Sequence, residues 1–378
     1  MHIIVDANIL KPTLQKLCTI ANRSSSVPIL NCVSIRTLSQ DRVQLTATDQ
    51  DAELIVTIPA EVIESGYWAI EAHRLANAIA SAADGSQIKL KLVKDNHRIE
   101  VRHGRSGFKL PCLLGDDMPH LNFTGAEWRI DLAGVELTSL LDVCSFAEPA
   151  KGHRLYLQGV QLRTLDGKLC SYASDGHRAA RSPSDIEVPD GFCDVIVPTG
   201  NCHRIMSLFK DSTDLSLMAH KRMIFVGGGD YQLISKLIDA EPIDIERIIP
   251  KQREHVVRVD RKRLIATIDS LIGLTDKETR TLRFVVMEDG LYICLSEKTD
   301  AEGESVLEAK CQAAAMTVGI NGSYVKDVCA AFDTAELDIH FDNQSANLFV
   351  ANGNQKTTCV MPIRVQDVDI NKIGLGAD

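Results

Sequence analysis

Long apolar runs and leader features are missing from this sequence. No apolar stretch among its 378 residues approaches the ~20 that a membrane-spanning helix needs. The first six residues, 1–6, have no basic region and already include an acid, whereas a signal peptide is basic and then apolar. We therefore expect a cytoplasmic protein that has no membrane partner.

Paired cysteines are missing as well. The 11 cysteines are scattered singly, with no C-x-x-C pair that could begin a zinc site. Most of them adjoin apolar residues, as in Leu17-Cys18 and Cys359-Val360, where a free cysteine behaves as a small buried hydrophobic residue. This pattern suits a reducing compartment, and it predicts no metal site and no cofactor.

Motifs of the common hydrolases and nucleotide-binding enzymes are absent too, since the sequence has no G-x-S-x-G, no H-E-x-x-H and no P-loop. The stretch Asp175-Gly176-His177-Arg178 contains an Asp and a His, but neighbours in sequence do not by themselves face one another, and no nucleophile or metal accompanies them. We expect no catalytic residue; a cytosolic hydrolase is a distant alternative. Gly227-Gly228-Gly229 lacks the context of a phosphate loop and predicts a hairpin turn.

A threefold repeat is what the sequence does have. Its length predicts two or three domains, and its 45% apolar and 24% charged residues are typical of a globular protein. Three segments begin alike, with a short strand, an Asp at the position of a helix N-cap, and apolar residues at helical spacing. The three N-cap candidates are Asp6, Asp131 and Asp260.

Each segment then continues with a second helix, a polar turn and an alternating strand. The turns contain Asp84-Gly85, Asp211-Ser212 and Asp333-Thr334. The chain therefore predicts three copies of a strand–helix–three strands–helix–three strands unit, an α+β fold with two helices on two sheets in each copy. Three unrelated domains would not explain the recurring order. We expect domains at 1–126, 127–254 and 255–378, with a tail at 366–378, and helices at 8–23, 71–83, 132–147, 198–210, 260–273 and 322–332.

The net charge of −10 argues against a DNA-binding protein unless the charges are segregated. The six predicted helices carry ten cations and six anions, a net charge of +4, so the rest of the chain carries −14. If the helices share one face, that face attracts a phosphate backbone and the outside repels it. Ordinary solvated helix faces are the alternative. An excess of this size predicts weak contact that does not depend on base sequence.

Several short stretches stand out in order along the chain: Pro28-Ile29-Leu30, Thr46-Ala47-Thr48-Asp49, the segment 104–110, the segment 173–178, the segment 235–239 and Met361-Pro362-Ile363-Arg364. Together they resemble the motifs of the bacterial DNA sliding clamps, the β subunits of DNA polymerase III. The resemblance implies a non-enzymatic processivity factor, a head-to-tail homodimer whose six domains form a ring around duplex DNA.

The resemblance also implies partners that bind through a short peptide. They are the DNA polymerase III α subunit, the clamp loader δ subunit, translesion polymerases, and mismatch-repair and ligase proteins. The peptide would enter a cleft between domains two and three, an apolar slot flanked by Arg. The matching residues are Leu157, Ser174, Gly176, His177, Arg178, Ala179, Pro242, Arg247, Ile248, Asn321, Tyr324, Val360, Met361, Pro362, Ile363 and Arg364.

Three positions of this cleft depart from the family pattern. Ala179 stands where a larger aliphatic residue is usual, Thr279 stands where an aromatic is common, and Glu241-Pro242-Ile243-Asp244 replaces an F-P-D-like stretch. These departures predict a wider and more polar slot. They keep open a second hypothesis, a clamp-fold paralogue that has kept the ring but lost the usual polymerase partners.

Family matches also predict the DNA contacts and the ring seam. The DNA-binding candidates that match family contacts are Arg23, Lys151, His153, Arg154 and Tyr156, and the helix cations Lys11, Arg74, Arg204 and Lys262 are expected to face the hole as well. The dimer-interface candidates are Arg74, Arg105, Phe108, Leu110, Ile272, Leu274, Glu302 and Glu304. The residues after Val365 are expected to form a mobile tail; alternatively Gln366-Asp367-Val368-Asp369-Ile370, which faintly resembles a clamp-binding peptide, competes for the cleft.

Overall fold

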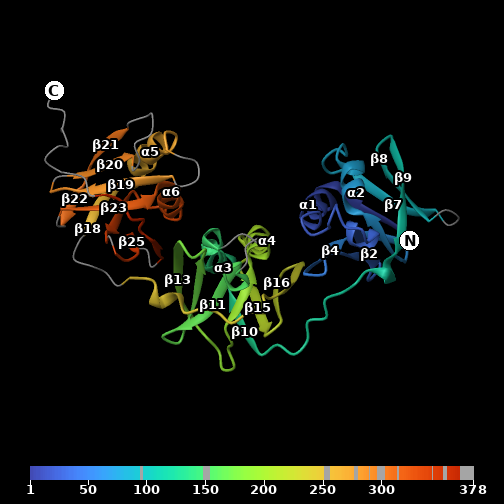
Figure 1. The fold of residues 1–378 in the computed structure, drawn as a ribbon. Helices are drawn as coiled ribbons and strands as arrows, with labels where there is room; N and C mark the ends of the chain where they lie inside the picture. The colour runs from blue at the N-terminus through green and yellow to red at the C-terminus, as the bar shows by residue number, and fades with distance from the viewer. Residues whose placement is uncertain are drawn as a thin grey trace. The chain divides into compact units, whose positions relative to one another are not determined.

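The chain folds into two compact units in a computed structural model that describes residues 1–93, 97–147, 154–250, 256–275, 280–288, 290–295, 303–312, 315–342, 344–351 and 356–366 (Figure 1). Lys151, His153, Thr279, Glu302 and the tail beyond Gln366 lie outside the described residues. Unit 1 comprises Met1–Thr138, Val188–Cys193 and Gly200–Asp239, and unit 2 comprises Ser139–Glu187, Asp194–Thr199 and Ala240–Asp378.

Unit 1 is built on one antiparallel sheet of 13 strands, in the order β10-β15-β16-β17-β4-β3-β2-β6-β9-β8-β7-β1-β5. Strands such as β7 and β15 alternate buried side chains with more exposed ones, as is typical of an antiparallel sheet with one covered face. The strands are β1 (His2–Asp6), β2 (Cys32–Thr37), β3 (Arg42–Thr48), β4 (Ala52–Pro59), β5 (Glu61–Glu64), β6 (Tyr67–Glu71), β7 (Gln87–Val93), β8 (Arg98–His103), β9 (Ser106–Leu114), β10 (Trp128–Leu132), β15 (Leu215–His220), β16 (Met223–Gly228) and β17 (Tyr231–Lys236).

The pairing of β17 with β4 joins the first and central thirds of the chain into this single sheet. The pairs run from Tyr231 opposite Val56 to Ser235 opposite Ala52. Asp230, at the hairpin before β17, strengthens the junction: its carboxylate pairs with Arg42, and its carbonyl accepts a hydrogen bond from the Thr57 N–H. The hairpin itself confirms the turn predicted at Gly227-Gly228-Gly229, since Gly228 pairs with Tyr231 and Gly229 has a φ of 56°.

The described part of unit 2 forms two antiparallel sheets. The larger has nine strands in the order β14-β11-β12-β13-β26-β25-β24-β18-β22, and the smaller has four in the order β21-β20-β19-β23. The pairing of β13 with β26 joins the central and last thirds of the chain. The strands are β11 (Gly159–Leu165), β12 (Lys168–Ser174), β13 (Arg178–Glu187), β14 (Val195–Pro198), β18 (Val256–Asp260), β19 (Thr281–Val286), β20 (Gly290–Leu295), β21 (Glu304–Glu308), β22 (Lys310–Gln312), β23 (Met316–Asn321), β24 (Glu336–His340), β25 (Asn347–Val350) and β26 (Thr357–Val360).

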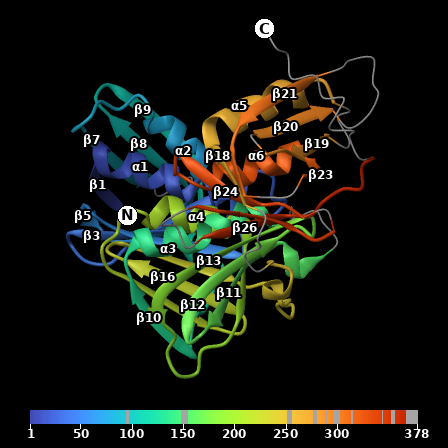
Figure 2. The ribbon, with the colours of Figure 1, turned by 90° about the vertical axis from the view of Figure 1, so that its left-hand side faces the viewer.

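The described residues contain six α-helices, where the repeat predicts them. In unit 1, α1 packs against α2; in unit 2, α5 packs against α6, and the pair lies along β19, β21 and β23 (Figures 1 and 2). Short 3-10 segments occur at 28–31, 115–117, 142–146, 155–157 and 245–247. The helices are α1 (Ala7–Leu17), α2 (Ala72–Ile79), α3 (Gly134–Leu141), α4 (Thr199–Phe209), α5 (Arg261–Ile272) and α6 (Gly322–Ala330).

The helices are shorter than predicted at several ends. The first helix was expected to reach residue 23, but α1 ends at Leu17. After it, the backbone N–H groups bond three residues back instead of four, as in a 3-10 turn: Thr19 N–H donates to the Lys16 carbonyl and Ile20 N–H to the Leu17 carbonyl. Likewise α3 starts only at Gly134 and gives way to a 3-10 turn at Asp142.

Two of the three predicted N-caps are confirmed. The Asp6 carboxylate accepts from the Asn8 N–H at 2.7 Å, and the Asp260 carboxylate accepts from the Arg263 N–H at 2.8 Å. The prediction for Asp131 is wrong. It belongs to β10, where Arg129 and Ser216 occupy its carboxylate, and a Glu136 oxygen accepts from the Ala133 N–H at the start of α3.

The predicted number of strands between the helices is also wrong. Three were expected in each repeat, but the described residues have five in the first and third repeats (β2 to β6 and β19 to β23) and four in the second (β11 to β14). In each repeat a short strand leads directly into the second helix, namely β6, β14 and β23. Each of these strands ends at the residue immediately before the helix. Its alternation of apolar and polar residues is therefore too short to be distinguished from the helical pattern in the sequence. Of the 11 cysteines, seven are buried and the other four are half-buried, as the sequence predicts for small apolar residues.

None of the helices in the described part of the chain has the length and apolar character needed to cross a membrane.

Gly134 of α3 lies close to the backbone at the end of α4 in unit 1. A Cβ at this position would lie 1.9 Å from the carbonyl oxygen of Phe209, a backbone atom that no side-chain rotation can move. Gly134→Ala is therefore expected to lower the free energy of unfolding by about 2–3 kcal/mol, measured by urea denaturation. Gly200→Ala is the matched control, because a Cβ there meets nothing within 4 Å. Equal stability of the two variants would contradict this close packing.

Candidate functional site

The Asp175–Arg178 turn of unit 2 is held by hydrogen bonds from its own carboxylate. The Asp175 carboxylate accepts from the N–H groups of His177 and Arg178, at 2.9 and 3.0 Å, and from Arg178 Nε at 3.0 Å. Gly176 has a φ of 86°, which favours glycine. The imidazole of His177 stacks on Tyr324 instead of facing the carboxylate, with ring centroids 6.0 Å apart. The turn therefore contains no Asp/His dyad.

Arg178 connects this turn to two other elements of unit 2. Its Nη1 lies 2.6 Å from an Asp327 oxygen on α6, and its Nη2 donates to the Ser145 carbonyl at 3.3 Å. The guanidinium lies 4.9 Å from the Tyr324 ring centre and 5.3 Å from that of Phe146. The Arg178 side chain is only 12% exposed, so these contacts are largely shielded from water.

The C-terminal strand brings further predicted residues to the same turn. Val360 pairs with Arg178 across the β13–β26 ladder, and the Met361 N–H donates to the His177 carbonyl at 2.8 Å. The Ile363 N–H donates to Gly319 at the other side. Met361 and Ile363 remain exposed, and Pro362 between them is half-buried. The result is a small surface with apolar side chains beside Arg178 and Tyr324.

Other predicted cleft residues have structural roles in unit 2. Ala179 is buried in a cluster with Ile245, Ile249 and Cys359, and Leu157 is buried in a 3-10 turn. Asn321 is the N-cap of α6, where its side-chain oxygen accepts from the Ser323 and Tyr324 N–H groups. Ser174 is buried and adjoins the turn, where its hydroxyl donates to the Arg178 carbonyl. The remaining four are more open: Pro242 is half-buried, and Arg247 (which pairs with Asp244), Ile248 and Arg364 are exposed.

Sequence reasoning missed three contributors to this surface. Phe146 and Asp327 contact Arg178, and Arg154, predicted as a DNA contact, packs on the turn. The Arg154 Nη2 donates to the Asp175 carbonyl at 2.7 Å, and a Cβ on Gly176 would lie 2.3 Å from its Nη1. The glycine at this position was the available signal, since the φ of 86° favours a residue without a side chain.

The remaining DNA candidates differ in how far their charge is neutralised. Lys11 donates to the Ala82 carbonyl at 2.8 Å and lies 3.4 Å from Asp84, Arg74 pairs with Glu71, and Arg204 pairs with Asp49. Lys262 is exposed on α5, and Tyr156 is half-buried. Arg23 is different, because its partner is a histidine: Arg23 Nη2 lies 2.9 Å from His73 Nδ1.

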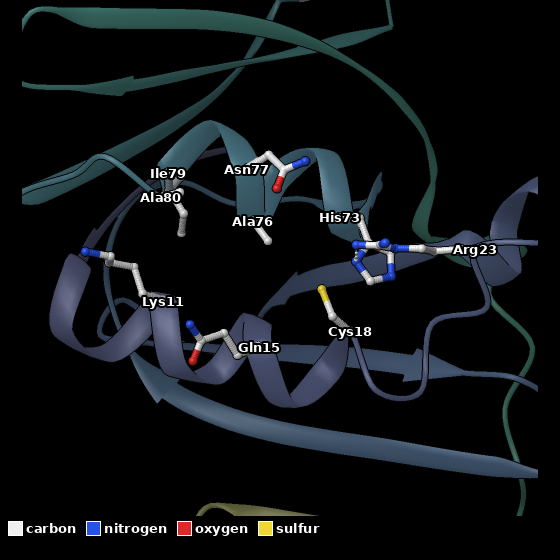
Figure 3. Close-up of a pocket in the computed structure, with 9 residues that line it drawn as sticks. All are labelled: Lys11, Gln15, Cys18, Arg23, His73, Ala76, Asn77, Ile79 and Ala80. Atoms are coloured by element: carbon white, nitrogen blue, oxygen red, sulfur yellow. Dashed lines mark hydrogen bonds between the residues drawn. The ribbon is translucent and has the colours of Figure 1, made fainter.

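A pocket of about 410 Å³ lies between α1 and α2 in unit 1, with Arg23 and His73 at one end and Lys11 at the other (Figure 3). The side-chain amides of Gln15 and Asn77 lie between these ends. Burial, and then the charge of Arg23, lower the pKa of His73 below its ordinary value. The full lining comprises Lys11, Gln15, Cys18, Arg23, His73, Ala76, Asn77, Ile79 and Ala80.

The seam candidates lie on exposed strand and helix ends. Phe108 of β9 is 38% exposed and Leu274, after α5, is 44% exposed. Arg105 is exposed and Leu110 is half-buried. Glu304 of β21 accepts a hydrogen bond from the Tyr292 hydroxyl, and Ile272 is half-buried against Gly322.

Family models match nearly the whole chain. The N-terminal, central and C-terminal domain models of the DNA polymerase III beta subunit match residues 1–122, 131–242 and 246–364, respectively.

Relatives and solved structures agree with these matches. The chain is 26% identical to the beta sliding clamp of Caulobacter vibrioides, over 97% of this chain and 100% of the relative, and equally to that of Pseudomonas aeruginosa. A crystal structure of the Pseudomonas aeruginosa DNA polymerase sliding clamp superimposes with a TM-score of 0.90 at 26% identity, covering 97% of this chain and 100% of the other. A Bartonella birtlesii sliding clamp bound to griselimycin gives 0.91 at 25% identity, with the same coverage.

Proposed function

The chain belongs to the DNA polymerase III beta subunit family and is a non-catalytic DNA sliding clamp, and from this premise we propose that two copies form a head-to-tail ring of six domains around duplex DNA. The proposed domains are residues 1–126, 127–254 and 255–378. The observation that carries the proposal is a strand pairing that recurs along the chain.

The recurring pairing joins the last strand of one repeat to a strand of the preceding repeat, the third strand after that repeat's first helix. It is made by β17 with β4 and again by β26 with β13. The equivalent strands that remain are β9 in the first repeat and β21 in the third. Within the described residues, β21 pairs with β20 alone, and residues 106–111 of β9 pair with β8 alone. An edge of this kind is a template for pairing with another chain.

Pairing of β9 with β21 of a second copy would complete the same pattern and close a ring with two identical seams. The side chains at these edges suit such a seam. Phe108 and Val306 are exposed apolar residues, and the charges around them are complementary, with Arg105 near β9 and Glu304 on β21. A sheet that continues from domain to domain then forms the outer wall, and the helices face the DNA.

A closed ring holds DNA topologically, so individual contacts can be weak. The proposed contacts are to phosphates, from the helix cations and from Lys151, His153, Arg154 and Tyr156. Their strength should fall with salt and should not depend on base sequence. We place the protein in the cytoplasm, where the chromosome of a bacterium is replicated.

The surface around Arg178, Tyr324 and Met361 is the proposed site for the clamp-binding peptides of polymerases, the clamp loader and repair proteins. Exposed apolar side chains beside a shielded arginine suit an extended peptide with aliphatic or aromatic anchors and a polar first residue. The tail remains a second candidate ligand for this site, and removal of residues 366–378 would then raise the affinity for a partner peptide.

The ring is tested by mass and by retention on DNA. We expect a mass near twice the 41.5 kDa of one chain, and retention of the loaded protein on nicked circular DNA but not on linear DNA. A monomeric mass, or equal loss from both DNA forms, would contradict the proposal. A ring that is retained but binds no Gln-Leu-x-Leu-Phe peptide would instead identify a paralogue that lacks the usual partners.

A further inference from the structure

Two turns of the chain, 48–52 in the first repeat and 174–178 in the second, are built alike. In the first turn, the Asp49 carboxylate accepts from the N–H groups of Asp51 and Ala52, at 3.0 and 2.7 Å. The aspartate of the second turn binds the N–H groups two and three residues further on in the same way. In each turn the hydroxyl of the first residue also donates to the last carbonyl, at 2.8 Å. The first turn is therefore the structural counterpart of the turn at the proposed peptide site.

The following repeat adds the end of its last strand to both turns in the same register. The Lys236 N–H donates to the Asp51 carbonyl at 2.8 Å at the first turn, and the Met361 N–H donates to the His177 carbonyl at 2.8 Å at the second. The two junctions between repeats therefore share their backbone geometry, and the differences between them arise from side chains.

A guanidinium binds the second oxygen of the capping carboxylate at both junctions, but it comes from different elements. At the second junction, Arg178 of the turn itself donates through Nε to Asp175 Oδ2 at 3.0 Å. At the first junction the corresponding turn residue is Ala52, which has no charge to offer. Arg204 instead extends from α4 of the second repeat, and its Nη2 lies 3.1 Å from Asp49 Oδ2. The carboxylate of the first repeat is therefore held by a cation of the second repeat.

Arg204 makes further contacts that connect the two repeats. Its Nη2 also donates to the Thr19 carbonyl at 3.0 Å, just beyond the C-terminal end of α1, where a helix favours positive charge. Its Nη1 donates to Asn201 Oδ1 at 2.8 Å, and the Asn201 amide donates to Ser235 on β17 at 2.6 Å. The side chains of Arg204 and Asp49 are only 24% and 20% exposed, so this network is largely shielded from water.

The side chains at the first junction do not suit a peptide ligand. Where the second junction exposes Met361, the first has Lys236, whose Nζ lies 3.1 Å from the Asp51 carboxylate. An ion pair at this point offers no apolar contact to the aliphatic or aromatic anchors of an extended peptide. The first junction is therefore better suited to hold two repeats together than to bind a partner.

We propose that Arg204 holds the junction between the first and second repeats and thereby fixes the curvature that lets the proposed ring close, so that it is a positioning residue and not a phosphate contact. A head-to-tail assembly of two chains closes only if the rotations between successive domains add up to a full turn. The second seam then forms within one dimer, at an effective concentration that falls when a junction loosens. The effect on the ring rests on the proposed function, whereas the contact that holds the junction does not.

Hydrogen exchange measured by mass spectrometry tests whether Arg204 holds the junction. In Arg204→Met we expect exchange of the β17 segment, 231–236, to accelerate about tenfold, the factor that corresponds to the loss of one hydrogen bond to a charged group. Asp49→Asn should also accelerate it, because the asparagine oxygen can still accept from the N–H groups of the turn while the charge is lost. The double variant should exchange no faster than Arg204→Met, since both changes remove one contact.

Arg42→Met is the matched control. It removes the same cation from the other arginine–carboxylate pair of this junction, with Asp230, whose two side chains are 43% and 54% exposed. An exposed pair contributes little, so we expect exchange of the β17 segment to change less than about threefold. The β10–β15 ladder, within the second repeat, should exchange as in the native protein in every variant and reports that the fold is intact.

Sedimentation and retention on DNA test the effect on the ring. We expect Arg204→Met to raise the dissociation constant of the dimer about tenfold and to shorten retention on nicked circular DNA, whereas Arg42→Met should behave as the native protein. The slope of duplex affinity against salt concentration should be unchanged in Arg204→Met, because only the loss of a phosphate contact lowers that slope.

Each other outcome overturns a stated part of the inference. If the β17 segment of Arg204→Met exchanges as in the native protein, Arg204 does not hold the junction. If exchange accelerates but the dimer and its retention are native, Arg204 holds the junction without shaping the ring, and the positioning role is wrong. A lower salt slope would identify Arg204 as a phosphate contact. If the native protein is a monomer, the ring proposal fails, and the exchange data alone decide whether Arg204 holds the junction.

Discussion

Phe108→Asp is expected to convert the dimer into folded monomers that are no longer retained on circular DNA. Phe108 is exposed on β9, and the proposed seam would bury it against the partner. A carboxylate placed there without a partner loses its hydration, at a cost of several kcal/mol. A loss of about 3 kcal/mol raises the dissociation constant of the dimer more than a hundredfold. Analytical ultracentrifugation at nanomolar concentration measures this directly.

Two further variants make the result specific to the seam. Leu274→Asp, on the other proposed side, should give the same result, since Leu274 is also exposed. Ile272 is less suitable, because it packs on Gly322 and its truncation would disturb unit 2. Ile63→Asp is the control: it introduces the same charge at an exposed apolar residue of β5 and should remain dimeric. A Phe108→Asp protein that is still dimeric would show that the seam lies elsewhere.

Arg178→Ala is expected to destabilise unit 2 by about 2–3 kcal/mol and to abolish binding of a partner peptide. The change removes the ion pairs with Asp175 and Asp327 and uncovers the rings of Phe146 and Tyr324. Burial and the neighbouring Asp175 carboxylate already raise the pKa of Tyr324, and the loss of the cation should raise it further. Urea denaturation gives the stability, and fluorescence anisotropy with a labelled Gln-Leu-x-Leu-Phe peptide gives the affinity.

The matched control is Arg258→Ala in the same unit. Arg258 also forms a two-contact pair with a carboxylate, Asp338, but its side chain is 42% exposed, so its removal should cost less than about 1 kcal/mol and leave peptide affinity unchanged. Arg178→Lys keeps the charge but loses the planar guanidinium, so the peptide affinity of this variant should lie between those of Arg178→Ala and Arg258→Ala. If Arg178→Ala binds the peptide as tightly as Arg258→Ala does, the peptide site is elsewhere.

Local features of this protein were determined by the sequence alone. The spacing of apolar residues placed all six helices, and the N-caps Asp6 and Asp260 act through atoms two or three residues away. The hairpin at Gly229 likewise depends on neighbouring residues. One such prediction, the N-cap at Asp131, failed because of a contact from a distant part of the chain. Asp131 has the same position in its repeat as the two true caps, but Ser216 and Arg129, brought together by the β10–β15 pairing, hold its carboxylate in the strand.

Pairing between repeats was decided only by the tertiary structure. No sequence rule predicts that β17 adds to β4 or that β26 adds to β13, because backbone hydrogen bonds between strands carry no sequence signature and the edges belong to different repeats. The same holds for the sites. Arg178 meets Asp327 across 149 residues, and Arg23 meets His73 across 50, so the partner of each cation depends on how the chain returns to it. Charge counting could predict that the helices are basic; only the fold determines which of those charges a carboxylate neutralises and which one remains beside a neutral histidine.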